Sequence, residues 1–407
     1  MGGALLDLVA KGGQDIYFIS NPQISFFKKV FKKHTNFAIE YQKLAFDSAL
    51  DFGLTTKYTI PRKGDLIKNM FLQFEIPDII SSDGQKCSYV NYIGYAMIEY
   101  IELYINTQKI DRLTGEWMYI YNELSVKEDK KLGYKVMVGG TDFINYNSNV
   151  GSRGGIYMIP LNFWFNKETG SAIPYCALQY SDIEIKLKLR NFDQLWVTKN
   201  GTPPIGTFKL TNAHLGIERI YLDTKERKEF ATQSHEYLIK QTQYSLNNNI
   251  TQNTQSKTFN LIFNHPIVEL IFVVQSKSKF VTKANGGNDY FNFSKTDTYP
   301  FSDTIKTAKI LLNGQERTPE MTAKELRFYQ PIQYHTSIPN NYIYSYSFSL
   351  NPEDYQPSGS SNFSRFDTKQ LQIEFADNIP HSELKVFAVS YNILRITQGL
   401  GGVAYIN

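Results

Sequence analysis

Few residues in this sequence have the types and the spacing that catalysis or metal binding requires. No two of its six histidines stand in a His-x-His or His-Glu-x-x-His pattern, the usual spacings of metal ligands. The histidines are His34, His214, His235, His265, His335 and His381. Paired carboxylates such as Glu353 and Asp354 lie in a proline-flanked stretch, where solvation explains them better than acid–base chemistry. We therefore expect no catalytic residues and no metal ligands.

Motifs for phosphate binding and acyl transfer are also missing. The glycine-rich pieces at 11–14 and 151–155 lack the preceding strand and the Lys-Ser/Thr pair of a phosphate-binding loop. No Gly-x-Ser-x-Gly motif, which exposes a nucleophilic serine, occurs in the chain. The sequence therefore predicts a protein that is not an enzyme and that holds no cofactor.

Two cysteines and four sequons could carry covalent chemistry. Cys87 and Cys176 are far apart and have no Cys-x-x-Cys partner, so we expect free thiols in a protein made in a reducing compartment. Asn-x-Ser/Thr sequons, the acceptor sites of N-glycosylation, stand at Asn200, Asn249, Asn292 and Asn362. They matter only if the protein meets a glycosylating machinery.

The composition of the chain indicates which class of protein it belongs to. Among 407 residues, 43 are Lys or Arg and 39 are Asp or Glu, which gives a net charge of +4. Aromatic residues make up 14% of the chain and charged residues only 20%. This balance excludes disorder for most of the chain, and the charge is too weak for a surface that wraps nucleic acid. The first nine residues lack the features of a secretory signal, and no run of apolar residues reaches membrane-spanning length.

One basic segment near the N-terminus is the feature most suited to a partner. A helix is predicted over Ser25–His34, with an apolar stripe on one side and four lysines on the other. The stripe is Phe26, Phe27, Val30 and Phe31, and the lysines are Lys28, Lys29, Lys32 and Lys33. Such a helix could touch an anionic membrane or a nucleic acid. Because the stripe is short, we favour the alternative that Phe27 and Phe31 pack under a β-sandwich and the lysines face water.

Strand patterns dominate the rest of the chain. Apolar and charged residues alternate without a break from Ile183 to Leu189, which predicts a half-buried strand. The same period recurs at 101–105 and 371–375, whereas 270–274 is apolar throughout and suits a strand covered on both faces. Turn residues punctuate these segments at 81–84, 200–204, 285–288 and 357–360. The pattern indicates an all-β protein built of antiparallel sandwiches or barrels.

Two further helices and a faint internal repeat organise the chain. A charged helix is predicted at Asp223–Glu236, and another begins at Thr318 as N-cap with Pro319 at the first helical position. Residues 101–108 resemble 308–315, and each is a strand running into an Asn-x-Gln turn. In both halves a helix-like stretch follows, at 115–129 and 319–329, and then an alternating strand. This order predicts two copies of one domain joined near 223–236.

Six groups of segments, in order along nearly the whole chain, carry a likeness to a known family. They include Gly12-Gly13-Gln14-Asp15-Ile16-Tyr17, Asn21-Pro22-Gln23-Ile24-Ser25-Phe26-Phe27, Ile159-Pro160-Leu161-Asn162-Phe163-Trp164-Phe165, Tyr221-Leu222-Asp223-Thr224-Lys225-Glu226-Arg227, Asn264-His265-Pro266-Ile267, Asn351-Pro352-Glu353-Asp354, Asn362-Phe363-Ser364-Arg365-Phe366-Asp367 and Gly399-Leu400-Gly401-Gly402. With these the chain resembles the double jelly-roll major capsid proteins of the nucleocytoplasmic large DNA viruses, of the iridovirus and phycodnavirus type.

The resemblance implies an all-β fold of two tandem eight-stranded antiparallel jelly rolls with short connecting helices. We accordingly expect an N-terminal arm at 1–24, a first jelly roll at 25–222, a helical connector at 223–236, and a second jelly roll with a C-terminal tail at 237–407. Two jelly rolls per chain and three chains per capsomer would give a pseudo-hexameric tile. Contacts between chains would then use part of the aromatic excess, because interface cores favour aromatic residues.

The family also implies partners and a location. We expect a structural capsid protein that forms a homotrimer, contacts neighbouring capsomers and tiles an icosahedral shell. Minor capsid or cement proteins would lie beneath it, and an internal viral membrane would lie near the N-terminal arm, with Lys28, Lys29, Lys32 and Lys33 on the inner face. No specific nucleic acid is expected, and the protein would be made in the host cytoplasm and reside in the virion.

The chain looks compact for this family, which leaves alternatives open. Its outward loops, at 275–302 and 344–363 by analogy, are expected to be short, and Asn292 and Asn249 are the candidate glycosylation sites, with Asn292 the better one. A minor double jelly-roll capsid component is the main alternative. A glycan-binding β-sandwich module is a less favoured one, because it would need export.

Overall fold

The structure is a computed structural model of the chain. It describes residues 2–406 except 47–48, 83, 85–86, 141–150, 153, 199–200, 282–287 and 297–301. The sequon at Asn200 and most of the turn predicted at 285–288 therefore lie outside the described residues. The chain divides into two compact units, Met1–Asn36 and Phe37–Asn407.

The N-terminal unit holds two short helices and corrects one prediction. Its helices are α1 (Gly3–Val9) and α2 (Gly13–Ile19), and no helix forms over 25–34, so the helix predicted at Ser25–His34 is wrong. Phe27 and Phe31 are 99% and 81% exposed, so the packing expected of them is not observed either. A helix of about ten residues is marginal in water without a surface to pack on, and lysines four residues apart repel each other.

The first half of the second unit is built from two main sheets. One has the strand order β1 (Phe37–Ala45), β13 (Thr211–Leu222), β3 (Leu66–Ile76) and β10 (Ile173–Pro174), with β9 (Gly155–Pro160) also paired to β3. The other has the order β2 (Thr55–Thr59), β11 (Ile183–Leu189), β6 (Ile98–Ile105) and β7 (Gln108–Leu113). Two small ribbons pair β12 (Trp196–Thr198) with β5 (Cys87–Tyr89), and β4 (Ile79–Ile80) with β8 (Gly151–Ser152).

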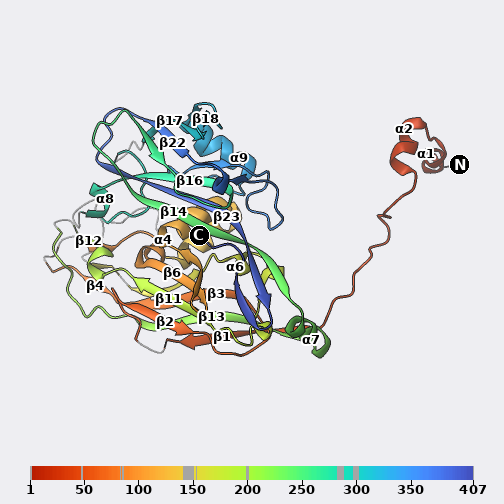
Figure 1. Cartoon of the computed structure of the whole chain (residues 1–407), viewed down its shortest axis with the longest axis horizontal. Coiled ribbons are helices and arrows are strands. Elements are labelled where there is room, and N and C mark those ends of the chain that lie inside the picture. The colour runs from red at the N-terminus through yellow and green to blue at the C-terminus, as the bar shows by residue number, and fades with distance from the viewer. Residues whose placement is uncertain are drawn as a thin grey trace. The chain divides into compact units, whose positions relative to one another are not determined.

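Short helices connect these strands. They are α3 (Ile93–Met97), α4 (Gly115–Ser125), α5 (Glu128–Met137) and α6 (Trp164–Lys167), with 3-10 turns η1 (Thr169–Ser171), η2 (Tyr175–Ala177) and η3 (Phe192–Gln194). Figure 1 shows α4 and α6 in the middle of the second unit, between the sheets of its two halves.

The second half repeats the arrangement. One sheet has the order β14 (His235–Ile250), β23 (Ser382–Thr397), β16 (Pro266–Ser276) and β20 (Tyr344–Ser347), with β21 (Ser361–Asn362) and β24 (Leu400–Val403) paired beside this path. The other has the order β15 (Ser256–Asn260), β22 (Lys369–Phe375), β17 (Ile305–Leu312) and β18 (Gln315–Glu316), with β19 (Met321–Thr322) paired to β17. The helical pieces are α8 (Ser278–Val281), the π-turn η4 (Glu325–Tyr329), α9 (Gln330–Tyr334) and the 3-10 turn η5 (Phe363–Arg365).

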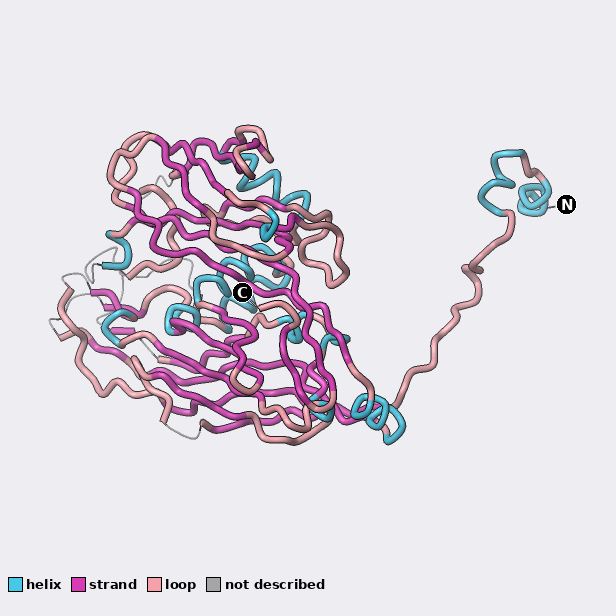
Figure 2. The backbone as a smooth tube through the Cα atoms, viewed as in Figure 1, coloured by secondary structure: helices cyan, strands magenta, loops and turns pink. Residues whose placement is uncertain are grey.

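All described pairings are antiparallel, and strands dominate the tube in Figure 2. The strand orders of the two halves correspond, with β10 and β9 paired to successive parts of β3 as β21 and β20 are paired to successive parts of β16, so the predicted fold of two tandem antiparallel jelly rolls is confirmed. The predicted repeat has a direct counterpart: β6 pairs with β11 in the first half, and β17 pairs with β22 in the second.

The Asn-x-Gln turns of the repeat are held in the same way in both halves. Asn106 and Asn313 adopt left-handed φ values of 54° and 50°, which asparagine tolerates better than most residues. The Asn106 side chain accepts a hydrogen bond from the Asp182 amide at 2.9 Å, and Asn313 accepts one from the Thr368 amide at 3.0 Å. One local sequence signal therefore fixes the same turn twice.

The strand patterns fold as expected. The residues of β11 alternate between buried and half-buried from Ile183 to Leu189, whereas β16 is buried along almost its whole length. The reason is that β16 has a core on each face. Its Leu270, Phe272 and Val274 belong to the second core, and its Ile271 and Val273 belong to a cluster shared with the first half.

Helix α7 (Thr224–Thr232) joins the two halves at the place predicted for a connector. Asp223 caps it by accepting a hydrogen bond from the Thr224 amide at 2.7 Å. Arg227 on this helix forms a 2.9 Å ion pair with Asp65, which ties the connector to the first half.

The third predicted helix begins later than expected. Thr318 is buried and its hydroxyl accepts a hydrogen bond from the Ile310 amide at 3.0 Å, so this hydroxyl caps no helix. The cap is Thr322, whose amide donates to Glu325 at 2.7 Å while its hydroxyl accepts from the Glu325 amide at 3.4 Å. Pro319 therefore precedes a short strand, and the sequence signal of Thr followed by Pro was misread.

Candidate functional site

The described residues bring no metal-binding group together. No cluster of three or more His, Cys, Asp or Glu side chains within the described ranges has the geometry to hold an ion. Cys87 is buried and Cys176 is half-buried, and neither forms a disulfide bond. Among the helices in the described part of the chain, none combines the length and the hydropathy of a membrane span. The features that remain are the contacts between the two jelly rolls and the apolar surfaces that lack such contacts.

Helix α4 forms the centre of the junction between the jelly rolls. Its Trp117 stacks on Phe387 of β23 with ring centroids 5.4 Å apart. Two residues further along the helix, Tyr119 contacts Phe291 with centroids 4.4 Å apart. Burying large aromatic rings supplies much of the free energy of such a contact, which makes the two jelly rolls one packed body.

A buried ion cluster accompanies these rings. Glu116 of α4 lies 2.9 Å from the ammonium of Lys385 in the second jelly roll and 3.5 Å from Arg190 in the first. Burial alone would raise the pKa of Glu116, but Lys385 and Arg190 hold it below its ordinary value. Lys385 also donates to Gln275 at 2.8 Å. Because each charge is paired, removing one partner would leave another buried and uncompensated.

A second polar cluster lies around His335, directly after α9. The Nε2 atom of His335 is 3.3 Å from Glu269 of β16, and its Nδ1 atom is 3.0 Å from Glu353. Burial would lower the pKa of His335, but the two carboxylates outweigh it and raise the pKa. Lys240 of β14 donates to the carbonyls of Pro352 and Asp354 at 2.7 and 2.5 Å. These bonds fix the loop after β20 against the second jelly roll.

The C-terminal hairpin of β23 and β24 crosses back to the first jelly roll. The Val403 amide donates to Gln108 at 3.0 Å, and the Gly401 amide donates to Ser181 at 3.1 Å. A Cβ atom on Gly401 would lie 2.5 Å from the end of the Leu178 side chain, so a larger residue here would have to displace that buried leucine. The hairpin therefore fastens the end of the chain to the turn of the sequence repeat.

Apolar residues are exposed at several places in the described part of the second unit, and two of these surfaces lie on different jelly rolls. The first, the sheet face, comprises Ile39, Tyr41 and Phe71 on the outer side of β1 and β3. Ile39 and Tyr41 are 52% and 44% exposed, and the Tyr41 ring stacks on Phe71 with centroids 5.4 Å apart. Phe71 lies flat over Gly216, where a Cβ atom would come within 2.4 Å of the ring.

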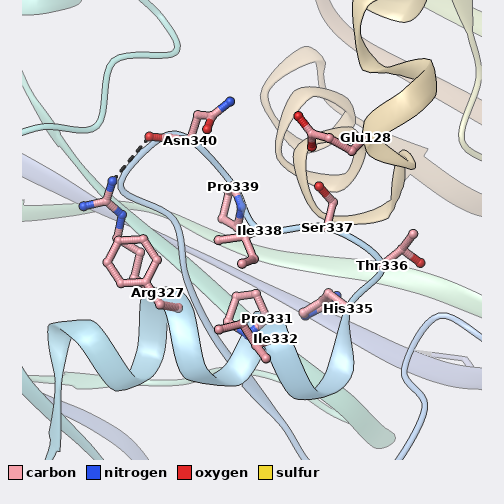
Figure 3. Close-up of a pocket in the computed structure, with 11 residues that line it drawn as sticks. Glu128, Arg327, Pro331, Ile332, His335, Thr336, Ser337, Ile338, Pro339 and Asn340 are labelled. Atoms are coloured by element: carbon pink, nitrogen blue, oxygen red, sulfur yellow. Dashed lines mark hydrogen bonds between the residues drawn. The ribbon is translucent and has the colours of Figure 1, made fainter.

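The second surface, the helix face, comprises Phe328, Tyr329 and Ile332 on η4 and α9. These residues are 37%, 52% and 63% exposed. Phe328 and Ile332 also line a groove of about 570 Å³ between α9 and the segment that follows it, shown in Figure 3. Arg327 closes one end by donating to the Asn340 carbonyl at 3.3 Å, and Glu128 of α5 faces the groove. Exposed apolar surface of this kind commonly marks an interaction site.

The residues singled out from the sequence lie elsewhere. Lys28, Lys29, Lys32 and Lys33 are exposed in the N-terminal unit. Asn249 is exposed at the end of β14. Asn292 is half-buried, and its side-chain oxygen accepts hydrogen bonds from the amide and hydroxyl of Ser294 at 3.1 and 2.7 Å. These bonds use the oxygen of the Asn292 amide, whereas a glycan would attach to its nitrogen, so glycosylation at Asn292 or Asn249 stays a prediction.

Comparison with known proteins shows which family has this architecture. A family model described as "Major capsid protein N-terminus" matches residues 25–223, and one described as "Large eukaryotic DNA virus major capsid protein" matches 226–402. The major capsid protein of Pyramimonas orientalis virus is 36% identical, with all of both chains covered. The chain belongs to this capsid protein family.

Other relatives of this family agree. The major capsid protein of Paramecium bursaria Chlorella virus 1 is 32% identical over the full length of both chains. The solved structure of PBCV-1 VP54 superposes with a TM-score of 0.81 at 28% identity and covers 94% of this chain and 100% of its own. The Faustovirus major capsid protein shares the fold, with a TM-score of 0.79 at 13% identity over 97% and 96% of the two chains.

The protein is therefore a structural component of a virion shell, as the resemblance implied. The alignment to the major capsid protein of Phaeocystis pouchetii virus extends over 522 residues against 407 here, which fits the expected compactness. The sequence did not single out the helix face, the sheet face or the pairing of Glu116 with Lys385. A signal for the helix face was present, because Phe328 and Tyr329 fall in the repeated helix-like stretch.

Proposed function

We propose that three copies of the chain form a pseudo-hexameric capsomer that tiles an icosahedral shell. The observation that carries this proposal is the matched strand order of the two jelly rolls. Three chains would supply six similar lobes, and six lobes can make nearly equivalent contacts around a ring. The exposed sheet face and helix face supply apolar surface for such contacts.

Mass and shape in solution test this proposal. Light scattering coupled to size exclusion should give a particle of about three times the chain mass of 46.9 kDa. Negative-stain images of that particle should show three-fold symmetry with a hexagonal outline. A strictly monomeric protein at tens of micromolar would contradict the homotrimer.

The finer partners belong to the same proposal. Neighbouring capsomers, minor capsid or cement proteins, and an internal membrane near the N-terminal arm would contact the tile, and synthesis would occur in the host cytoplasm. The domain limits of 1–24, 25–222, 223–236 and 237–407 remain proposals, supported by the position of α7 between the halves.

The four lysines of the arm provide a separate test. We place Lys28, Lys29, Lys32 and Lys33 on the inner face of the shell, although they do not form a helix. Replacing all four by Gln should leave the trimer mass unchanged and reduce binding to vesicles that contain phosphatidylserine. Equal vesicle binding by both proteins would remove the membrane from the proposal.

A further inference from the structure

The helix face and the sheet face are both partly exposed among the described residues of one chain, and we infer that the helix face of one copy packs on the sheet face of a second copy. This inference rests on the proposed trimer and names the surfaces that would hold it together. The occupant of each face follows from the internal repeat, because the chain already contains one example of the same contact.

That example is the junction between its own jelly rolls. There, α4 of the first jelly roll packs on the outer face of the sheet β14–β23–β16 of the second, where Trp117 meets Phe387. Phe387, Ile271 and Val273 of this outer face share a buried cluster with the first half. A helix of one jelly roll therefore covers the outer sheet of the next.

The helices on the two jelly rolls occupy equivalent positions. Helix α4 follows β7 and is capped by Thr114, whose hydroxyl accepts from the Trp117 amide at 3.1 Å. The segment η4–α9 follows β18 and β19 and is capped by Thr322. Met118 and Leu326, each four residues after its cap, are buried against a core. Each helix thus packs on its own jelly roll through the same position after its cap, and its opposite side points away from that jelly roll.

The sheets correspond equally well. Phe71 of β3 pairs with Gly216 of β13, and Ile271 of β16 pairs with Phe387 of β23, at matching places in the two strand orders. The outer face around Ile271 is covered by α4. On the corresponding face of the first jelly roll, Phe230 of α7 covers Ile220 and Leu222 at one end, while Ile39 and Tyr41 beside them remain about half exposed.

Each jelly roll therefore has one face suited to the jelly roll before it and one suited to the jelly roll after it. Within the chain, the outward face of α4 meets the β14–β23–β16 sheet of the second jelly roll. The remaining pair, the second helix face and the first sheet face, can meet only between copies. Such a head-to-tail contact is heterologous, and it closes into a ring when the rotation per jelly roll divides a full turn. Six jelly rolls, from three copies, give the ring of the proposed capsomer.

Charge substitutions on either face test the contact. The helix-face variant carries Tyr329→Asp and Ile332→Asp, and the sheet-face variant carries Ile39→Asp and Tyr41→Asp. We expect each to run as a monomer at about 10 μM, a loss of at least about 100-fold in association, because a buried unpaired carboxylate at an interface core is strongly unfavourable. Ile262→Asp is the matched control, because Ile262 is 83% exposed and belongs neither to the helix face nor to the sheet face. This variant should remain trimeric.

Mixing the two variants gives the sharper result. Each retains one intact face, so the mixture should form a one-to-one dimer through a single good contact but no closed trimer. A helix-to-helix or sheet-to-sheet interface would give no such dimer. If both variants remain trimeric, the inference is overturned while the trimer stands; if the unaltered protein is itself monomeric, the proposed function fails first.

Photo-crosslinking covers the case in which a variant does not fold. Benzoylphenylalanine at position 329 of the otherwise unaltered protein should link to peptides from β1 or β3 of another copy, as identified by mass spectrometry. Crosslinks confined to other segments would overturn the inference.

Discussion

The helix α4 and the segment η4–α9 occupy equivalent positions in the two jelly rolls, yet only α4 is buried. Trp117 of α4 is 1% exposed, whereas Tyr329 of η4 is 52% exposed. Both helices have a Thr cap and both anchor an apolar residue four positions later. The difference shows that burial here is decided by the neighbour that each helix meets. The outward side of the second helix remains exposed among the described residues.

The largest effect expected from this comparison is the loss of the α4 anchor. Trp117→Ala should lower the free energy of unfolding by about 3–5 kcal/mol, because it removes a fully buried ring and leaves a cavity. Tyr329→Ala should cost less than about 0.5 kcal/mol at concentrations where the chain is monomeric. Urea unfolding of both variants measures this contrast. Equal costs would mean that α4 gains no stability from the junction.

The two Asn turns should give smaller effects, with the larger one at Asn106. Asn106→Gly and Asn313→Gly each keep the left-handed backbone. Asn313→Gly loses one side-chain hydrogen bond, at about 1 kcal/mol, whereas Asn106→Gly loses two, because Asn106 also donates to the Ser181 hydroxyl at 2.9 Å. Asn106→Ala and Asn313→Ala should each cost about 1–2 kcal/mol more, because alanine disfavours that backbone. Thermal unfolding of the four variants checks this order. A larger loss of stability for Asn313→Gly than for Asn106→Gly would contradict this assignment of the side-chain hydrogen bonds.

The smallest expected effect is the pH dependence that His335 adds to the second jelly roll. Its pKa is raised above the ordinary 6.5, so the stability that its charge contributes is complete below pH 6.5 and is lost as the pH rises through the raised value. Burial also raises the pKa of Glu269, which acts in the same direction. Lys240, which faces the same loop, has a pKa lowered to about 8 by burial and so loses its charge at the top of this range.

His335→Gln isolates that contribution. The stability difference between the unaltered protein and this variant should shrink from pH 5.5 to pH 8.5, as measured by urea unfolding. His214→Gln is the control of opposite sign, because burial lowers the pKa of His214 in the first jelly roll. A difference for His335→Gln that stays constant with pH would mean that the histidine remains neutral between its two carboxylates.

Much of the fold could be predicted from local pattern. The alternation at 183–189 and the apolar run at 270–274 identified a half-buried strand and a doubly covered one, because each depends only on the side-chain period of a strand. The helix at Ser25–His34 was wrong for the converse reason. Its stripe is amphipathic, but a short helix forms only where a surface covers that stripe.

The contacts between the jelly rolls could not be predicted. Glu116 and Lys385 are 269 residues apart, and neither stands in a motif that announces a buried ion pair. His335 resembles any isolated histidine in the sequence, and its two carboxylates come from separate segments at 269 and 353.

By itself the sequence determined the strand pattern, the repeated Asn turns, the connector near 223–236 and the family likeness, since each rests on the order and period of neighbouring residues. The tertiary structure alone decided which of two equivalent helices is covered, which charges meet across the junction and which apolar faces stay open. The physical reason is that burial depends on what packs against a surface, and packing partners are brought together only when the chain has folded.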